Sequence, residues 1–328
     1  MKVIQFDAYG GYERLSLEER PVPTPGEGQV LVRMRCAGVT PLDHTARSGA
    51  LPYRLKLPLV PGGSGIGEVV DAGTTSLRAG TRVLVGGQGL GVLQDGTWRE
   101  YLALPAAQLL PIPADLPDEQ VIALTTGAGY LTAYLALTEL VGLQPGQTVL
   151  APGIGGAVGE GTMDVARALG AGRVISTASH GDKAKQGQAL GHEVIDLSQE
   201  SLQAGVLRLT EGRGVDVVID GVSGPLTGQE LGALAPGGQL VVVGYAGGKE
   251  ALINVTDIIW RKARIHGFMF SLFAPEKIVQ ANLQLFEWLR EGRLKPSLAK
   301  RFPLEQAAAA TRCLIEERPY GRIVLDIG

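Results

Sequence analysis

Residues 148–244 alternate between apolar runs and amphipathic segments, a pattern that few folds can accommodate. The apolar, β-branched runs lie at 148–153, 173–177, 193–197, 215–220 and 238–244. Helix-like segments separate them, at about 157–169, 182–190 and 225–234, with one more after 197. Strands that alternate with helices form a parallel sheet that is covered on both faces. Because such crossovers are right-handed, the pattern predicts a doubly wound α/β domain.

The N-terminal segment has a different pattern. Up to about residue 115, β-branched runs at 29–39, 65–73 and 81–87 are separated by glycine and proline. Residues 21–28 are a connector, because their prolines lack a backbone donor. This segment predicts an all-β domain resembling a small barrel.

The C-terminal segment predicts one more strand after Arg264, a helix over 278–292 and a final strand over 321–328. We expect that last strand to return to the first domain. A chain of 328 residues with 45% hydrophobic residues is long enough for two domains with sizeable cores.

Charge and composition exclude several classes of function. The net charge is −3, the pI is about 5.9, and no basic stripe is present, which argues against nucleic-acid or anionic membrane partners. Residues 1–7 resemble a strand rather than a signal peptide, and no uninterrupted apolar run approaches the roughly 18 residues of a membrane span. We therefore expect a cytoplasmic protein. Cys36 and Cys313 are expected to be buried as small hydrophobes.

The glycine-rich loop after the first parallel strand is the best candidate for a cofactor site. It runs from Gly153 through Gly156, Ala157 and Val158 to Gly159, and a helix begins within it. A helix N-terminus presents unpaired N–H groups to a pyrophosphate, and glycines let the backbone approach it. The spacing is G-x-x-G-x-x-G rather than G-x-G-x-x-G. The alternative is a glycine-rich turn that only packs a helix.

The end of the next strand bears on the choice of cofactor. A carboxylate commonly accepts the ribose hydroxyls of NAD at this place, but here the strand ends in Thr177, Ala178 and Ser179. Hydroxyls and cations attract a 2′-phosphate, so Ser179, His180 and Lys183 favour NADPH. Two alternatives remain open. Asp182 can receive a ribose in an NAD enzyme, and Lys183 can be a solvated lysine.

The segment Val60–Gly67, with four glycines around Ser64, allows three interpretations. Ser64 is not in a G-x-S-x-G nucleophile elbow, because residue 66 is isoleucine. A phosphate cradle requires a helix to follow, whereas a strand is expected here. We predict a tight turn at a strand entry.

The chain resembles a medium-chain dehydrogenase/reductase, specifically its zinc-independent quinone oxidoreductase branch. The resemblance covers nearly the whole chain and is carried by residues 38–49, 57–73, 96–105, 131–137, 153–159, 212–224, 234–244 and 320–328. It implies a GroES-like β-barrel catalytic domain plus a doubly wound Rossmann domain. The implied boundaries are 1–118, completed by 265–328, for the first domain and 119–264 for the second.

The resemblance also implies that this chain lacks a catalytic zinc. Zinc-dependent relatives carry a His-Glu pair where this chain has Gly63-Ser64, and a cysteine ligand where it has Thr40. The structural zinc lobe of those relatives needs four cysteines, and this chain has two. Without a Lewis acid, an acceptor that stabilises negative charge by itself is favoured. We therefore predict hydride transfer to a quinone or an α,β-unsaturated carbonyl, without a metal.

Three residues are our candidates for contact with the substrate. The branch usually has asparagine at the position of Thr40, so the change puts its usual substrate contact in doubt. Asp43 either takes part in the chemistry or, as we favour, holds its loop through hydrogen bonds. Tyr53 either donates to a carbonyl oxygen or only covers the cleft. The neighbouring His44 is a packing residue or a proton shuttle.

Further cofactor contacts are expected at the carboxyl edge of the sheet. Thr132 matches a position near the nicotinamide in the family, with helix packing as the alternative. Val222, Gly244 and Tyr245 follow the fourth and fifth strands, where such sheets bind ligands. Residues 268–273 are placed near the nicotinamide end, and the resemblance implies a homodimer through a nearby edge strand. A non-catalytic NADPH-binding sensor or structural protein and a zinc-free alcohol dehydrogenase are the alternatives.

Overall fold

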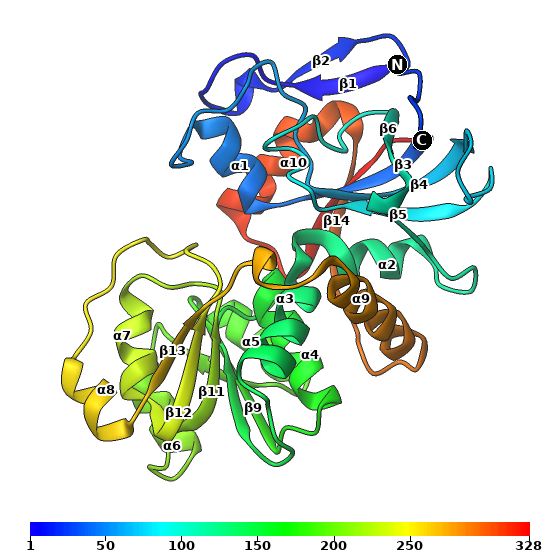
Figure 1. Ribbon diagram of the computed structural model, residues 1–328. Helices are drawn as coiled ribbons and strands as arrows, with labels where there is room; N and C mark the ends of the chain where they lie inside the picture. Colours follow the sequence, from blue (N-terminus) through cyan, green and yellow to red (C-terminus); the bar gives the residue numbers. More distant parts are fainter. The chain divides into compact units, whose positions relative to one another are not determined.

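The computed structural model describes residues 1–328 as two compact units (Figure 1). The first unit comprises Met1–Gly127 and Ser297–Gly328, and the second comprises Ala128–Pro296. The sequence predicts that residues 265–296 belong to the first domain and 119–127 to the second, whereas in the structure each segment belongs to the other unit. The reason is that residues 264–267 pair with a strand, and residues 275–290 pack on a helix, that lie far away in the sequence. A local sequence pattern does not reveal such contacts.

The second unit is built on a six-stranded sheet of parallel strands in the order β10-β9-β8-β11-β12-β13. Its strands are β8 Thr148–Ala151, β9 Arg173–Ala178, β10 Glu193–Asp196, β11 Val215–Asp220, β12 Leu234–Val242 and β13 Arg264–Gly267. Its α-helices are α3 Gly129–Leu135, α4 Ala157–Ala168, α5 Gly181–Ala189, α6 Leu202–Leu209, α7 Pro225–Gly232, α8 Val255–Arg261 and α9 Pro275–Arg290. The doubly wound α/β prediction is confirmed. The order of the strands reverses between β8 and β11, where open sheets of this kind bind ligands.

Burial explains why these segments are strands. All four residues of β8 are buried, and so are five of the six residues of β11. Strands covered on both faces have apolar residues at nearly every position. Helices α3 and α4 pack together, α6 contacts α7, and α7 contacts α8 (Figure 1). Helix α9 packs on α3, which is why residues 275–290 remain with this unit.

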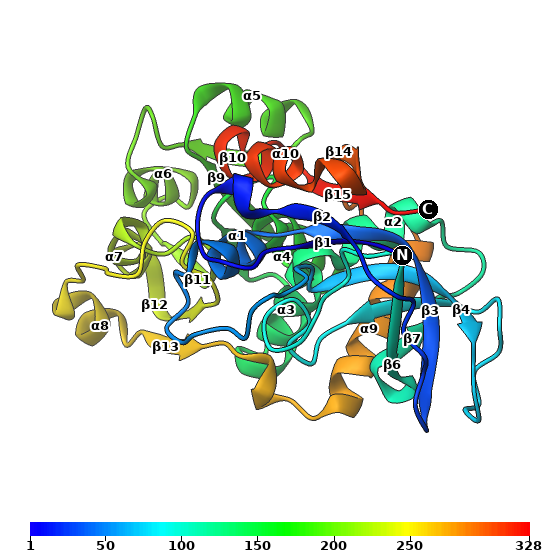
Figure 2. The same ribbon diagram turned by 90° about the horizontal axis from the view of Figure 1, so that it is seen from above.

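The first unit contains a seven-stranded sheet in the order β14-β15-β3-β4-β5-β7, with β6 also paired to β3. Its elements are β1 Lys2–Gln5, β2 Ser16–Glu19, β3 Gln29–Val39, α1 Pro41–Ser48, β4 Ser64–Asp71, β5 Arg82–Gly86, β6 Tyr101–Pro105, β7 Leu109–Pro111, α2 Asp118–Thr125, β14 Leu298–Pro303, α10 Ala307–Arg312 and β15 Arg322–Asp326. Strand β15 pairs antiparallel with β3, so the predicted return of the last strand is confirmed. Both chain ends lie in this unit (Figure 2).

The prediction that residues 1–115 are all β is wrong at one place, because α1 interrupts them. The local sequence explains this helix. Thr40 precedes it, Pro41 is its first residue, and Asp43 accepts the backbone N–H of Thr40. Gly49 ends the helix with a φ of 76°, in the left-handed region that glycine favours. These are ordinary helix start and stop signals.

Residues 118–140 form a helical run that is long and apolar enough to cross a membrane, and most of it is buried inside the protein. The run is not straight. Gly127 and Ala128 have φ values of 73° and 50°, and they separate α2 from α3. α2 belongs to the first unit and α3 to the second, and each is buried as apolar core helices are.

Candidate functional site

The glycine-rich loop lies between β8 and α4, at the switch point of the sheet. Gly153 has a φ of 81°, a conformation that side chains with a Cβ rarely adopt. Gly156 is the N-cap of α4, and its N–H donates to the Gly153 carbonyl over 3.0 Å. The loop therefore turns sharply and directs the first turn of α4, with its positive dipole end, to the carboxyl edge of the sheet.

Close backbone approach fixes the shape of this loop. A Cβ on Gly159 would overlap the Gly153 carbonyl oxygen and lie 2.9 Å from the Pro152 oxygen. A Cβ on Gly156 would lie 3.0 Å from the same Gly153 oxygen. The residues present thus form a narrow cradle that a side chain would fill. This geometry fits a pyrophosphate bound by backbone N–H groups.

The loops after neighbouring strands contact one another along the carboxyl edge. Gly153 donates its N–H to the Thr177 hydroxyl over 3.1 Å, and the Thr177 carbonyl accepts from Ile154 over 2.9 Å. A Cβ on Gly153 would lie 3.1 Å from the Val222 side chain. The structure therefore brings together the predicted residues after β8, β9 and β11. Thr177 is 1% exposed and holds the glycine loop rather than facing solvent.

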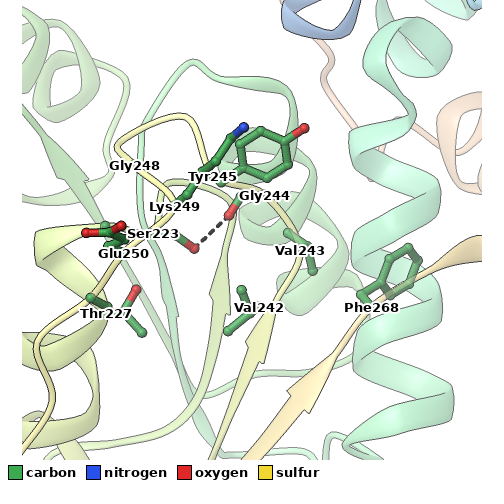
Figure 3. A pocket seen from close by; sticks show the side chains of 12 residues that line it. Ser223, Thr227, Val242, Val243, Gly244, Tyr245, Gly248, Lys249, Glu250 and Phe268 are labelled. Carbon is green, nitrogen blue, oxygen red and sulfur yellow. Dashed lines mark hydrogen bonds between the residues drawn. The ribbon is translucent and has the colours of Figure 1, made fainter. Parts of the chain in front are cut away.

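A pocket of about 420 Å³ opens beside the ends of β11 and β12 (Figure 3). It is lined by Ser223, Gly224, Thr227, Val242, Val243, Gly244, Tyr245, Gly248, Lys249, Glu250, Ala251 and Phe268. Gly244 and Tyr245, both predicted cofactor contacts, are among these residues. Lys249 lies with its ammonium 5.7 Å from the centre of the Tyr245 ring, so one wall presents an aromatic ring and a cation together.

The turn between β9 and α5 contains the residues that bear on cofactor choice. Ser179 and Asp182 are exposed, and Lys183 is half-buried in the first turn of α5. No carboxylate occupies 177–179, but the structure adds an acid that the sequence analysis missed. Asp196 ends β10 and lies 3.2 Å from the position of a Cβ on Gly181. Its Oδ1 already accepts the N–H and hydroxyl of Ser198, which hold its pKa below the ordinary value.

A buried pair of acids lies behind the pocket. Asp220, the last residue of β11, and Glu230, in α7, are both 0% exposed. Neither oxygen of Glu230 has a hydrogen-bond partner. Burial, together with the neighbouring Asp220 carboxylate, raises the pKa of Glu230 well above its ordinary value of 4.5. Glu230 is therefore neutral under conditions in which an exposed glutamate is charged.

We expect Glu230→Gln to change how stability depends on pH. Native Glu230 keeps its proton above pH 4.5 while the unfolded chain releases it. The native state then binds more protons, so this residue lowers the free energy of unfolding as pH rises, by about 1.4 kcal/mol per pH unit until the native pKa is reached. A neutral glutamine removes that slope. Urea unfolding of both proteins at pH 5, 6, 7 and 8 should show the variant gaining relative stability with pH. A constant difference would contradict this assignment.

In the first unit, Asp43 ties α1 to the turn that precedes β4. Its Oδ2 accepts the N–H and hydroxyl of Thr40, each over 2.7 Å, and its Oδ1 accepts the Gly62 N–H over 2.9 Å. Burial raises the pKa of Asp43, and these hydrogen bonds offset part of the shift. The contacts agree with the structural alternative for Asp43. They also agree with the predicted turn, because Ser64 is the first residue of strand β4.

Tyr53 and His44 have different surroundings. Tyr53 is 49% exposed, and no hydrogen bond links it to Thr40 or Asp43. His44 lies with its Nδ1 3.0 Å from the Arg47 guanidinium. Burial and the Arg47 charge lower the pKa of His44, which favours its neutral form. This packing against a buried arginine agrees with the first alternative for His44.

The remaining predicted residues lie in the second unit. Thr132 is buried on α3, and Phe268 lines the pocket next to Phe270 and Phe273. No three His, Cys, Asp or Glu side chains are grouped so that they could hold a metal ion. The residues missed from sequence are Asp196, Asp220 and Glu230. Asp196 and Asp220 are each the last residue of an apolar strand. Because ligands bind at the carboxyl ends of parallel strands, this position could have identified both residues from the sequence.

Two family profiles match the chain. Residues 26–114 match the family described as the alcohol dehydrogenase GroES-like domain, and residues 157–288 match the family described as zinc-binding dehydrogenase. The first match lies in the first unit and the second in the unit that holds the glycine loop.

Individual proteins resemble the chain over its whole length. A quinone oxidoreductase of Pseudomonas aeruginosa is 33% identical, and the match covers 99% of each chain. The crystal structure of Escherichia coli quinone oxidoreductase complexed with NADPH is 25% identical, with a TM-score of 0.88 and coverage of 99% of this chain and 100% of that one. The structure of an NAD-dependent alcohol dehydrogenase is 30% identical, with a TM-score of 0.88 and full coverage of both chains.

Proposed function

Because this chain belongs to the quinone oxidoreductase branch of the medium-chain dehydrogenase/reductase superfamily, we propose that it reduces quinones or α,β-unsaturated carbonyls with NADPH. The glycine cradle at the end of β8 carries this proposal. Its loop is joined by direct contacts to the ends of β9 and β11. The bound NADPH of the E. coli relative supports the same cofactor here.

The proposal assigns a part of the cofactor to each loop. The N–H groups of Val158 and Gly159, in the first turn of α4, would hold the pyrophosphate. Ser179 and Lys183 would hold the 2′-phosphate, because no carboxylate at 177–179 repels it. Tyr245, with Val222 and Gly244, would border the nicotinamide end.

The chemistry required of the protein is modest for these acceptors. NADPH, when bound, supplies the hydride, and resonance in a quinone or enone spreads the resulting negative charge. The protein then has to orient the two molecules and exclude water. In the first unit, the exposed Tyr53 hydroxyl is the proposed donor to the acceptor oxygen. Thr40 already donates its hydroxyl proton to Asp43, so it would act through its oxygen lone pairs.

We also propose a homodimer formed through β13. This strand is at the edge of the six-stranded sheet, so one row of its backbone groups has no strand partner. Large apolar side chains around it are exposed, namely Trp260, Ile265 and Met269. Antiparallel pairing of two β13 strands would satisfy the backbone and cover this surface with an identical one.

The acceptor class is tested by NADPH oxidation at 340 nm with three acceptors. These are an ortho-quinone, an α,β-unsaturated ketone and a saturated ketone of similar size. We expect turnover with the first two and not with the third, because only a conjugated acceptor delocalises the charge. Equal turnover of the saturated ketone would favour an alcohol dehydrogenase. Saturable NADPH binding without turnover of any acceptor would favour a non-catalytic sensor.

A further inference from the structure

The loops that follow β11 and β12 are locked together by hydrogen bonds. The Val243 and Gly244 N–H groups donate to the Asp220 carbonyl over 2.9 and 3.2 Å. The Gly247 N–H donates to the Val222 carbonyl over 2.6 Å. A Cβ on Gly244 would lie only 2.7 Å from the Gly221 oxygen. The two loops are thus in backbone contact, and together they line the pocket.

The side chain of Ser223 bonds across these loops. Its hydroxyl lies 2.6 Å from the Gly244 carbonyl oxygen (Figure 3) and 3.0 Å from Asp220 Oδ2. A hydroxyl has a single proton, so it donates to one of these acceptors at a time. The shorter distance assigns that proton to Gly244. Gly244 precedes Tyr245, and both line the pocket, so this hydrogen bond fixes the backbone from which the Tyr245 wall of the pocket starts.

The backbone of Ser223 is held in an unfavourable conformation. Its φ is 57°, in the left-handed region that a serine rarely adopts. Asp220 stabilises it, because Oδ1 accepts the Val222 N–H over 2.9 Å and the Ser223 N–H over 2.6 Å. Oδ2 also accepts the Thr227 hydroxyl over 3.0 Å. Such strain persists only where surrounding contacts determine the conformation.

We propose that Ser223, whose backbone is held by Asp220, is a positioning residue: its hydroxyl fixes the 243–248 loop and with it the pocket wall that receives the nicotinamide end. The last step rests on the proposed function. The locking of the loop does not, because the hydrogen bonds are present in the protein alone. Asp220 accepts from the N–H groups of Val222 and Ser223 and from the Thr227 hydroxyl, and these bonds hold the turn that carries Ser223.

Ser223→Gly separates positioning from stability. Glycine adopts a φ of 57° without strain, so relief of that strain should offset the loss of the Ser223 hydrogen bond in thermal stability. The variant lacks the Cβ of Ser223 and with it the hydroxyl that bonds to Gly244. We expect amide hydrogens of residues 243–251 to exchange about ten-fold faster in the protein without cofactor, with the melting temperature unchanged or raised. We expect the Kd for NADPH, measured by fluorescence titration, to rise about ten-fold.

Glu211→Gly is the matched control. Glu211 has a φ of 53°, is exposed and lies in the turn before β11, so the substitution relieves the same strain away from the pocket. It should leave both the exchange rates and the Kd as in the wild type. Unchanged exchange at 243–251 in Ser223→Gly would overturn the proposal. If the wild type binds no NADPH while exchange still accelerates in Ser223→Gly, the proposed function fails and the locking of the loop stands.

Discussion

Gly159→Ala is expected to abolish tight cofactor binding with the fold intact. The added methyl group would overlap the Gly153 carbonyl oxygen and lie 2.9 Å from its carbon, so the loop must open. The loop cannot shift freely, because Gly153 is also bonded to Thr177 and lies against Val222. Misplacing binding groups by about 1 Å can cost a factor of roughly 100. We therefore expect the Kd for NADPH to rise about 100-fold, or about 2.7 kcal/mol.

Isothermal titration with NADPH measures this effect directly, and urea unfolding checks that the variant is folded. The control is Gly267→Ala in the same unit, where an added Cβ meets nothing within 4 Å. It should bind NADPH as the wild type does. Wild-type affinity in Gly159→Ala would show that the pyrophosphate is not held by this loop.

Ser179→Asp is expected to reverse the cofactor preference. A carboxylate at the end of β9 would repel a 2′-phosphate and accept ribose hydroxyls instead. Loss of a charge-assisted hydrogen bond costs about 1.5–3 kcal/mol, so kcat/KM for NADPH should fall roughly 10- to 150-fold. The value for NADH should stay constant or rise, because NADH carries no phosphate at this position.

Ser179→Asn tests whether charge or size causes the change. Asparagine has nearly the shape of aspartate without its charge, so it should retain most of the NADPH preference. The Ser179→Asp penalty should also shrink at high salt, because this turn is exposed and the repulsion is screened. An equal loss with NADPH and NADH in Ser179→Asp would move the 2′-phosphate site elsewhere.

Local patterns were sufficient to predict the sheet and the cradle. β3 and β11 have the predicted bounds, because each is a run rich in β-branched residues. The glycine loop was equally visible, since a strand, a turn and a helix N-terminus are adjacent in sequence. Helix α1 was missed although its signals are local. Its short polar sequence lacks the apolar spacing that identified the other helices.

What the sequence did not reveal depends on contacts between distant segments. β13 joins the second unit because it pairs with β12. A strand of only four residues is too short for its hydrophobic pattern to indicate which domain it belongs to. The Ser223 contact to Gly244 requires two loops to meet, and nothing near residue 223 indicates its partner. Glu230 resembles a solvated helix residue in the sequence. Its burial is set by packing of α7 against the sheet.

The most direct test of the central claim is oxidation of NADPH, and separately NADH, by the purified protein with an ortho-quinone and excess chelator. We predict faster turnover with NADPH, at a rate that the chelator does not change. Faster turnover with NADH would contradict the 2′-phosphate site at Ser179 and Lys183 and favour the acids Asp182 and Asp196. Loss of activity with the chelator would contradict hydride transfer without a metal.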